Sequence, residues 1–155
     1  MRFIGNIEAK SDSKGRVFVP ACFRRLLQTT GITRLMMRKD TYQECLVLYP
    51  EQSWNEQLDA LRQRLDRWNA HKQMIFRQFV SDVEEVPIDS SGRILIPKRY
   101  LQMANIQQEV RFIGMDDTIE IWAKEKLEQP FMDAETFSRE IEKIMTEKKE
   151  DNNNG

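Results

Sequence analysis

At 155 residues, with 40% hydrophobic and 32% charged residues, the chain has the composition of a soluble globular protein rather than a disordered or fibrous one. No apolar run approaches the roughly 20 residues that a membrane helix needs, and the N-terminal stretch MRFIGNIEAKSDSKG lacks the apolar core of a secretory signal, so we expect a cytoplasmic protein without a membrane partner. The net charge of −1 conceals a gradient, because residues 1–50 carry nine Lys/Arg against four Asp/Glu whereas residues 81–125 carry five against nine.

This gradient permits two interpretations. The basic half could form a local face for nucleic acid, or the unevenness could arise by chance or serve contacts between subunits. The chain's few metal-binding residue types are less informative. Cys22, Cys45 and the single His71 have no partners at metal-ligand spacing, so we predict neither a metal site nor a cofactor.

A nine-residue phrase occurs twice in the chain. DSKGRVFVP at residues 12–20 returns as DSSGRILIP at residues 89–97, and LVLYP at 46–50 corresponds to IEIWA at 119–123. The motif positions that pair are Asp12 with Asp89, Gly15 with Gly92, Arg16 with Arg93 and Pro20 with Pro97. A repeat of about 45 residues is too short to bury a core alone, so we expect the two copies to pack against each other.

Each copy predicts the same order of elements. The Asp-Ser-x-Gly stretch is a turn sequence, and RVFV or RILI after it indicates a short, substantially buried strand. The proline suits the first position of a helix. ACFRRLLQ places Phe23, Leu26 and Leu27 on one helical face, and KRYLQMA does the same with Tyr100, Met103 and Ala104. RLMMRK, CLVLYP, VRFIG and TIEIW are then typical of further strands.

The segment between the copies, residues 51–79, has the pattern of a helix. Trp54, Leu58, Leu61, Leu65 and Trp68 recur at helical spacing, which favours a helix packed on its own core over one that binds in a partner's groove. The apolar cluster after them is expected to begin a second helical segment and then the first strand of the second copy; it comprises Met74, Ile75, Phe76, Phe79 and Val80.

The C-terminal region has helical pattern in LEQPF (127–131) and in FSREIEKIMTEKK (137–149), interrupted by Pro130. The final EKKEDNNNG is expected to be disordered. We therefore divide the chain into a first repeat at 6–53, an inter-repeat helical segment at 54–80, a second repeat at 82–125, and a C-terminal helical segment with its tail at 126–155.

The doubled D-x-x-G-R followed by an apolar strand and Pro, the long helix between the copies, and the LYP that closes the first copy together resemble the MraZ family of the AbrB/SpoVT superfamily. The resemblance covers about residues 1–126. It implies an α+β fold in which two tandem AbrB/SpoVT-like β units form one pseudo-dimeric barrel of the swapped-hairpin or double-ψ type, with an inter-repeat helix and C-terminal helices.

The same resemblance implies a nucleoid-associated transcriptional regulator of the division and cell-wall gene cluster. Its partners would be double-stranded DNA with short repeated operator boxes and other copies of itself in a ring, with the first-repeat loops presented to DNA. Repetition would suit a subunit whose own basic charge is modest, because linked copies raise the effective concentration of each further contact.

Arg16 is the first candidate for a DNA contact, because a guanidinium can bond guanine O6 and N7 or clamp a phosphate. The alternative is a salt bridge to Asp12, which would hold the loop in either case. Lys14 at the tip of the turn suits a phosphate. Lys10, Arg24 and Arg25 are further candidates that could instead be simply solvated.

The second copy looks the poorer DNA binder. Ser91 stands where the first copy has Lys14, and DVEEVPID around it is acidic, although Lys98 and Arg99 partly offset that charge. Arg93 is therefore a lesser candidate contact. The remaining motif residues are assigned structural roles: Asp12, Gly15, Pro20, Asp89, Gly92 and Pro97.

An enzyme is not expected, nor a small-molecule substrate. A single His gives no catalytic set, and no GxxxxGK[ST] or GxGxxG occurs. The alternative functions are a non-catalytic oligomeric scaffold or an antitoxin-like partner protein. The basic first half argues against a scaffold alone, and a second full motif in place of a toxin-wrapping tail argues against an antitoxin.

Overall fold

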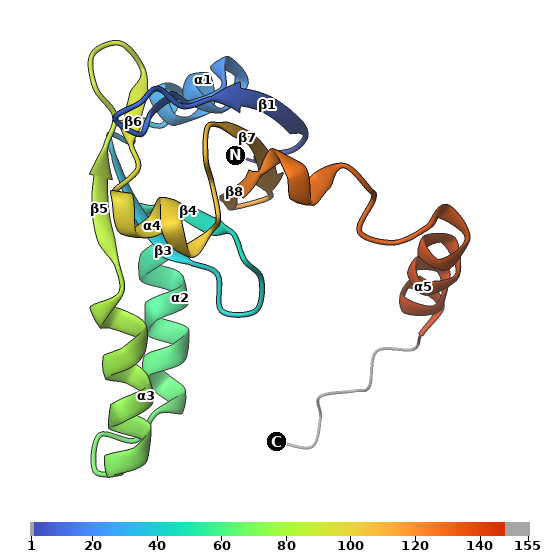
Figure 1. The fold of residues 1–155 in the computed structure, drawn as a ribbon. Helices are drawn as coiled ribbons and strands as arrows, with labels where there is room; N and C mark the ends of the chain where they lie inside the picture. Colours follow the sequence, from blue (N-terminus) through green and yellow to red (C-terminus); the bar gives the residue numbers. More distant parts are fainter. Residues whose placement is uncertain (1, 148–155) are drawn as a thin grey trace.

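The computed structural model describes residues 2–147, so residues 148–155 of the expected disordered tail lie outside the described residues. Within these residues, eight strands and six helical segments follow one another. Figure 1 shows how they are arranged in space. The strands are β1 Asn6–Lys10, β2 Arg16–Phe18, β3 Arg34–Lys39, β4 Leu46–Pro50, β5 Glu84–Pro87, β6 Arg93–Leu95, β7 Glu109–Met115 and β8 Thr118–Ala123. The helices are α1 Ala21–Thr29, α2 Glu51–Arg64, α3 Ala70–Ser81, α4 Lys98–Met103 and α5 Ala134–Thr146, with a 3₁₀ helix η1 at Lys124–Leu127.

The two copies exchange strands in one antiparallel sheet of order β1-β7-β8-β4-β3-β5. The first strand of each copy pairs with a strand of the other, β1 with β7 and β5 with β3, while β4 and β8 pair at the centre. The strands of the two copies correspond as β1 with β5, β3 with β7 and β4 with β8. Corresponding strands therefore occur in the same order from either edge of the sheet. The sheet therefore has an internal pseudo-twofold arrangement.

The fold is α+β, as the sequence predicts, but the predicted barrel is not found. Within residues 2–147 the sheet remains open, with β1 and β5 as its edges and no strand pair joining them. Strands β2 and β6 form a separate two-stranded sheet instead of closing the larger one.

The core is built by both copies together. Phe3, Phe23 and Leu27 from the first half are buried in one cluster with Tyr100 and Phe112 from the second. The Phe3 and Phe23 rings meet edge to face with centroids 5.6 Å apart. Burying apolar surface is the main stabilising term in folding, so each copy depends on the other for much of its stability.

The inter-repeat segment is helical, as predicted, and the second helix begins at Ala70, before the cluster from Met74 onward where a second helical segment was expected. Helix α2 ends at Arg64, and the side chains of Asp66 and Asn69 accept hydrogen bonds from the backbone N–H groups of Trp68 and Lys72, both at 3.0 Å. Such turn and N-cap chemistry overrides helical periodicity. Trp68 is consequently 96% exposed and outside the packed face.

Helix α3 then folds back along α2 as a helical hairpin. The rings of Trp54 on α2 and Phe79 on α3 stack with centroids 5.5 Å apart, and the guanidinium of Arg38 lies 4.2 Å from the Phe79 ring centroid. Phe79 and Val80 belong to α3, within the helical segment placed at 54–80, and the first strand of the second copy, β5, begins at Glu84.

Three smaller sequence predictions also differ from the structure. Pro20 and Pro97 are N-caps rather than first helical residues, because α1 and α4 begin one position later. Met103 is 37% exposed, because α4 ends there and leaves only Tyr100 buried. LEQPF is helical only at Leu127, since η1 ends there and α5 begins at Ala134, where Asp133 caps it through the Thr136 N–H at 2.7 Å.

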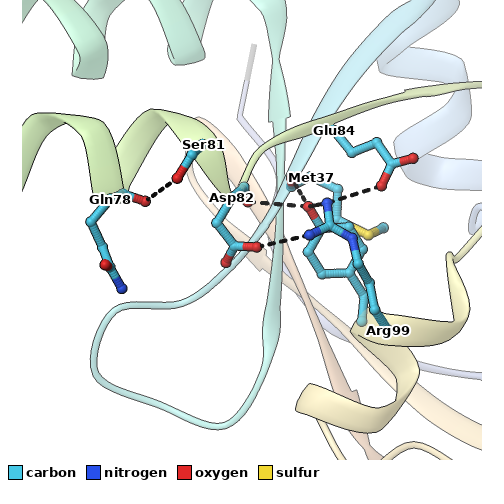
Figure 2. Close-up of polar contacts among 7 residues, drawn as sticks. Met37, Gln78, Ser81, Asp82, Glu84 and Arg99 are labelled. Atoms are coloured by element: carbon cyan, nitrogen blue, oxygen red, sulfur yellow. Dashed lines mark hydrogen bonds and ion pairs between the residues drawn. The ribbon is translucent and has the colours of Figure 1, made fainter.

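A polar junction fixes the base of the helical hairpin to the second copy. Figure 2 shows Arg99 of α4 between Asp82 and Glu84, to which it donates at 3.2 and 3.1 Å. The Tyr100 hydroxyl lies within hydrogen-bond distance of the carbonyl oxygens of Met37 (3.3 Å) and Asp82 (3.1 Å). Arg99 thus neutralises carboxylates at this junction.

None of the described helices is both long enough and apolar enough to cross a membrane.

Candidate nucleic-acid interface

The two copies of the repeated phrase pair directly with each other. Arg16 lies opposite Leu95, Val17 opposite Ile94 and Phe18 opposite Arg93, so β2 and β6 form an antiparallel ribbon. We call these two strands the paired ribbon. Figure 1 places β6 near α1 and β1, at the end of the molecule opposite the tip of the helical hairpin.

Alternation along the strands gives the paired ribbon one buried and one exposed face. Val17 and Ile94 are each 1% exposed and point into the core, whereas Phe18 and Leu95 are 54% and 53% exposed. Because Arg16 and Arg93 occupy the same alternate positions, two guanidinium groups and two large apolar side chains share the outer face. The strands are therefore half exposed, not substantially buried as predicted.

Phe18 and Leu95 were missed by the sequence reasoning, although the period-2 spacing from Val17 and Val19 or from Ile94 and Ile96 could have identified them. The guanidinium carbon of Arg93 lies 5.8 Å from the centroid of the Phe18 ring, within the range of a cation–π contact. The outer face is thus one connected surface across both copies.

Asp12 organises the first loop. Its Oδ1 accepts hydrogen bonds from the backbone N–H groups of Lys14 and Arg16, both at 2.9 Å, and its Oδ2 accepts one from Arg16 Nε at 2.7 Å. The ion pair named as the alternative role of Arg16 is therefore present. It uses only Nε, and within residues 2–147 the two terminal nitrogens of Arg16 have no hydrogen-bond or ion-pair partner.

Asp89 repeats this arrangement in the second loop. Its Oδ1 accepts from Ser91 N at 2.9 Å and Arg93 N at 2.8 Å, and its Oδ2 accepts from Arg93 Nε at 3.0 Å. The pKa values of Asp12 and Asp89 are both lowered, first by the backbone hydrogen bond from the arginine of the same loop. Both carboxylates are ionised at neutral pH and hold their arginines in matching orientations.

The two loops also cross each other closely. Val19 N–H donates to the Gly92 carbonyl at 3.0 Å, and Ile96 N–H donates to the Gly15 carbonyl at 2.9 Å. Gly15 has φ +88°, and a Cβ there would lie 2.7 Å from the Ile96 carbonyl oxygen. A side chain at Gly15 would thus clash with backbone, so glycine is required where the loops meet.

The other predicted contacts are distributed around the ribbon. Lys14 is exposed at the loop tip. Arg24 is half-buried, donates from Nη1 to the Val19 carbonyl at 3.2 Å, and covers Gly92, so it supports the crossing loops. Lys10 ends β1, and Arg25 is exposed on α1; within residues 2–147 neither makes a hydrogen bond or ion pair to the ribbon.

Most of the carboxylates near the second loop form ion pairs with arginines. Besides the Arg99 contacts with Asp82 and Glu84, Arg34 binds Glu85 through two hydrogen bonds of 2.9 and 2.7 Å. These carboxylates therefore repel a polyanion less than the sequence count suggests. Arg93 is presented much like Arg16, with side chains 29% and 37% exposed.

This arrangement suits a nucleic-acid duplex better than a small molecule or a metal ion. A two-stranded ribbon fits the major groove of B-DNA, where guanidinium groups bond guanine and apolar groups contact thymine methyls. Within the described residues, no group of three or more His, Cys, Asp or Glu side chains could hold a metal ion.

Comparisons with known proteins agree in naming one family. The family model described as "MraZ protein, putative antitoxin-like" matches twice, over residues 3–78 and 79–149. A protein of Bacteroides fragilis named "Transcriptional regulator MraZ" is 62% identical over 154 residues, covering 99% of this chain and 98% of its own. Proteins of the same name from Phocaeicola vulgatus and Bacteroides thetaiotaomicron are 63% and 61% identical, covering 94% and 95% of this chain and 94% of each relative.

Proposed function

The chain belongs to the MraZ family, whose curated relatives reported above are named transcriptional regulators, and we propose that it regulates transcription by binding double-stranded DNA through the outer face of the paired ribbon. The target is a set of short repeated boxes upstream of the division and cell-wall gene cluster. Several copies of the chain, assembled in a ring, engage these boxes together.

The observation that carries this proposal is the pairing of Arg16 and Arg93 on one exposed face. Each guanidinium is anchored through Nε by an ionised aspartate, which leaves its two terminal nitrogens without a hydrogen-bond partner within residues 2–147 and available for a bidentate contact. Anchoring lowers the side-chain entropy that binding would otherwise cost. Two such groups related by the pseudo-twofold suit adjacent positions in one groove.

The first test is DNA retardation on the region upstream of the protein's own operon, at several salt concentrations. Arg16→Ala should weaken binding by about 1 to 3 kcal/mol per engaged subunit, which is roughly 5- to 150-fold. If Arg16 contacts a base, discrimination between the operator and a mutated operator should fall as well. Unchanged binding by folded Arg16→Ala protein would exclude the Arg16 contact, and unchanged binding by folded Arg16→Ala/Arg93→Ala protein would exclude the paired ribbon as the interface.

The two loop-tip residues provide matched variants. Lys14→Ala should weaken binding to operator and control DNA equally and reduce the slope of affinity against salt by about one unit per site. Ser91→Lys places the same cation on the second loop and should steepen that slope by about one unit. Opposite changes in slope would show that both loop tips lie near phosphates.

The Arg93→Ala variant tests whether the second copy contributes less to DNA binding than the first copy or about as much. The charge pattern of the sequence predicts a smaller loss of affinity than for Arg16→Ala, whereas the equivalent geometry of the two arginines favours a comparable loss. Both outcomes keep the interface on the ribbon, provided that thermal unfolding shows an intact fold. A non-catalytic scaffold or an antitoxin-like protein without its own DNA contact would give no salt-dependent retardation for any of these proteins.

A further inference from the structure

Helix α5 presents an apolar stripe that the described chain leaves largely exposed, although its first member, Phe137, lines a pocket with residues 127–132. Its members recur at helical spacing i, i+4, i+7 and i+8, and no residue of α5 is buried. They are Phe137, Ile141, Ile144 and Met145, with exposures of 54%, 46%, 64% and 78%. A 13-residue helix is marginal by itself in water, and an amphipathic one is usually stabilised by packing its apolar face.

The helical hairpin offers a surface of matching character. Gln57, Ala60, Leu61 and Arg64 of α2, together with Phe79 of α3, line an apolar cleft of about 320 Å³. Figure 1 shows α5 on the right of the molecule and the hairpin of α2 and α3 at the lower left, so these elements of one chain are well separated.

The segments that carry these two surfaces have net charges of opposite sign. Residues 133–147, which cap and form α5, carry five Asp/Glu against two Lys/Arg. Residues 57–81, from the first residue of the cleft to the end of α3, carry five Lys/Arg against two Asp/Glu, while Glu51 and Glu56 at the start of α2 bring the net charge of the whole hairpin, residues 51–81, to +1. Net charges of −3 and +3 favour association of the two segments and disfavour association of either with itself.

We propose that α5 of one copy docks its apolar stripe into the hairpin cleft of a second copy. Such a contact is heterologous, because it joins different surfaces of the two chains, and repetition of it closes a ring when the rotation permits. The proposal deepens the ring assembly of the proposed function and rests on it. The hairpin tip and the paired ribbon lie at opposite ends of the molecule, so docking at the hairpin leaves the DNA face free.

The test measures molecular mass in solution, without DNA, for two variants and their matched controls. Ile141→Gln/Ile144→Gln removes the stripe, and Arg139→Gln/Glu142→Gln is its control on the opposite face of α5. Ala60→Glu blocks the cleft with a bulky negative group, and Asn55→Glu is its control on another face of α2. All four proteins keep the full chain, and the replaced residues are exposed.

We expect the parent and both controls to share one assembly mass, and the stripe and cleft variants each to dissociate to smaller species. Mixing the two defective variants should then produce a 1:1 pair that grows no further, because each supplies one intact half of a single contact. A pair of this kind is specific to docking between copies.

Other outcomes overturn the proposal. A stripe variant that keeps the parent mass, a parent that is monomeric, or defective variants that do not pair would each exclude α5 docking between copies. A stripe variant of unchanged mass but lower unfolding temperature would place α5 on its own chain. Binding of the stripe variant to a single-box DNA is measured separately, so failure of the contact is distinguishable from failure of the DNA-binding function.

Discussion

At the residue scale, the loops depend on a few side chains that combine structural and electrostatic roles. Asp12 closes its turn through two backbone N–H groups and aims Arg16 through a third contact, and Asp89 does the same for Arg93. The ion pair and the proposed DNA contact are therefore compatible, because they use different nitrogens of the guanidinium. Loss of either aspartate should disturb both loop shape and arginine orientation.

Because the two loops cross closely, Gly→Ala substitutions at different positions should lower the free energy of unfolding by different amounts. Gly15→Ala meets both a positive φ and a carbonyl oxygen at 2.7 Å, whereas Gly31 has φ +72° and open space around its missing Cβ. We expect Gly15→Ala to lower the free energy of unfolding by about 1 to 3 kcal/mol more than Gly31→Ala does. Denaturant unfolding measures both, and equal costs would contradict the close crossing.

Gly92→Ala should fall between these two variants. Its added Cβ would meet Arg24 side-chain atoms at 2.7 and 2.8 Å, which can move aside more easily than backbone. The expected loss of unfolding free energy therefore exceeds that of Gly31→Ala and stays below that of Gly15→Ala. A cost above that of Gly15→Ala would mean that Arg24 is held more rigidly than its single hydrogen bond to Val19 suggests.

The lowered pKa values of Asp12 and Asp89 predict an acid-sensitive contribution to stability. The folded pKa of each lies below its ordinary value of 3.8, so the contribution is complete above that value and is lost as the pH falls through the lowered folded pKa. Asp12→Asn/Asp89→Asn should thus unfold at a lower temperature than the parent at pH 6. That difference should shrink as the pH approaches 3, and a difference independent of pH would contradict the assignment.

At the scale of elements, the exchange of β1 and β5 makes the halves interdependent. Strand β1 has its sheet partner in the second copy, β5 has its sheet partner in the first, and β2 pairs with β6. Arg99 connects α4 to Asp82, which follows α3, and to Glu84, which begins β5 (Figure 2). The Tyr100 hydroxyl adds a hydrogen bond to the Asp82 carbonyl. Separation of the halves would expose apolar surface and unpaired strand edges at once.

A fragment of residues 1–80 should consequently fail to fold as a monomer. It would lack the partners of β1, β2 and the β8 side of β4, along with half of the shared core. We expect either an unfolded chain or a dimer that rebuilds the sheet from two copies. Mass measurement and thermal unfolding decide it, and a monomer with a sharp cooperative transition would show that the first copy is autonomous.

At the scale of the whole molecule, the proposed DNA binding depends on how many paired ribbons the proposed ring presents. A single chain brings two anchored arginines and a modest local positive charge to DNA, which supports only weak binding at physiological salt. Linked copies convert each further contact into an intramolecular one. Repeated DNA boxes and an oligomeric regulator are therefore physically matched.

If several linked copies bind together, DNA with several boxes should be bound more tightly than DNA with one box. DNA with several correctly spaced boxes should bind the parent protein about 10² to 10⁴ times more tightly than DNA with one box. The Ile141→Gln/Ile144→Gln variant should keep its affinity for one box and lose most of that gain. Equal gains for parent and variant, measured by retardation at a single salt concentration, would mean that α5 does not link the copies.

The sequence by itself determined the local architecture. Turn, strand and short helix follow from the Asp-Ser-x-Gly, apolar and proline pattern in both copies, and the strands over 34–39, 46–50, 110–114 and 118–122 follow from apolar and β-branched content. Arg16 was identified as a candidate contact for the same reason, since its place in the motif depends on neighbours only a few residues away. Local propensity and periodicity are sufficient for features of this range.

Only the tertiary structure decided how these pieces meet. The pairing of Arg16 with Leu95 and of Phe18 with Arg93 created a two-arginine face, and Arg34 and Arg99 neutralised carboxylates that the charge count had set against the second copy. The packing of α3 back against α2 was likewise stabilised by the stacking of Trp54 on Phe79, which lie 25 positions apart in the sequence. Strand exchange, ion pairing and ring stacking join residues that are tens of positions apart in the sequence. The energies of these contacts depend on distances between side chains, and the packing of the whole chain determines those distances.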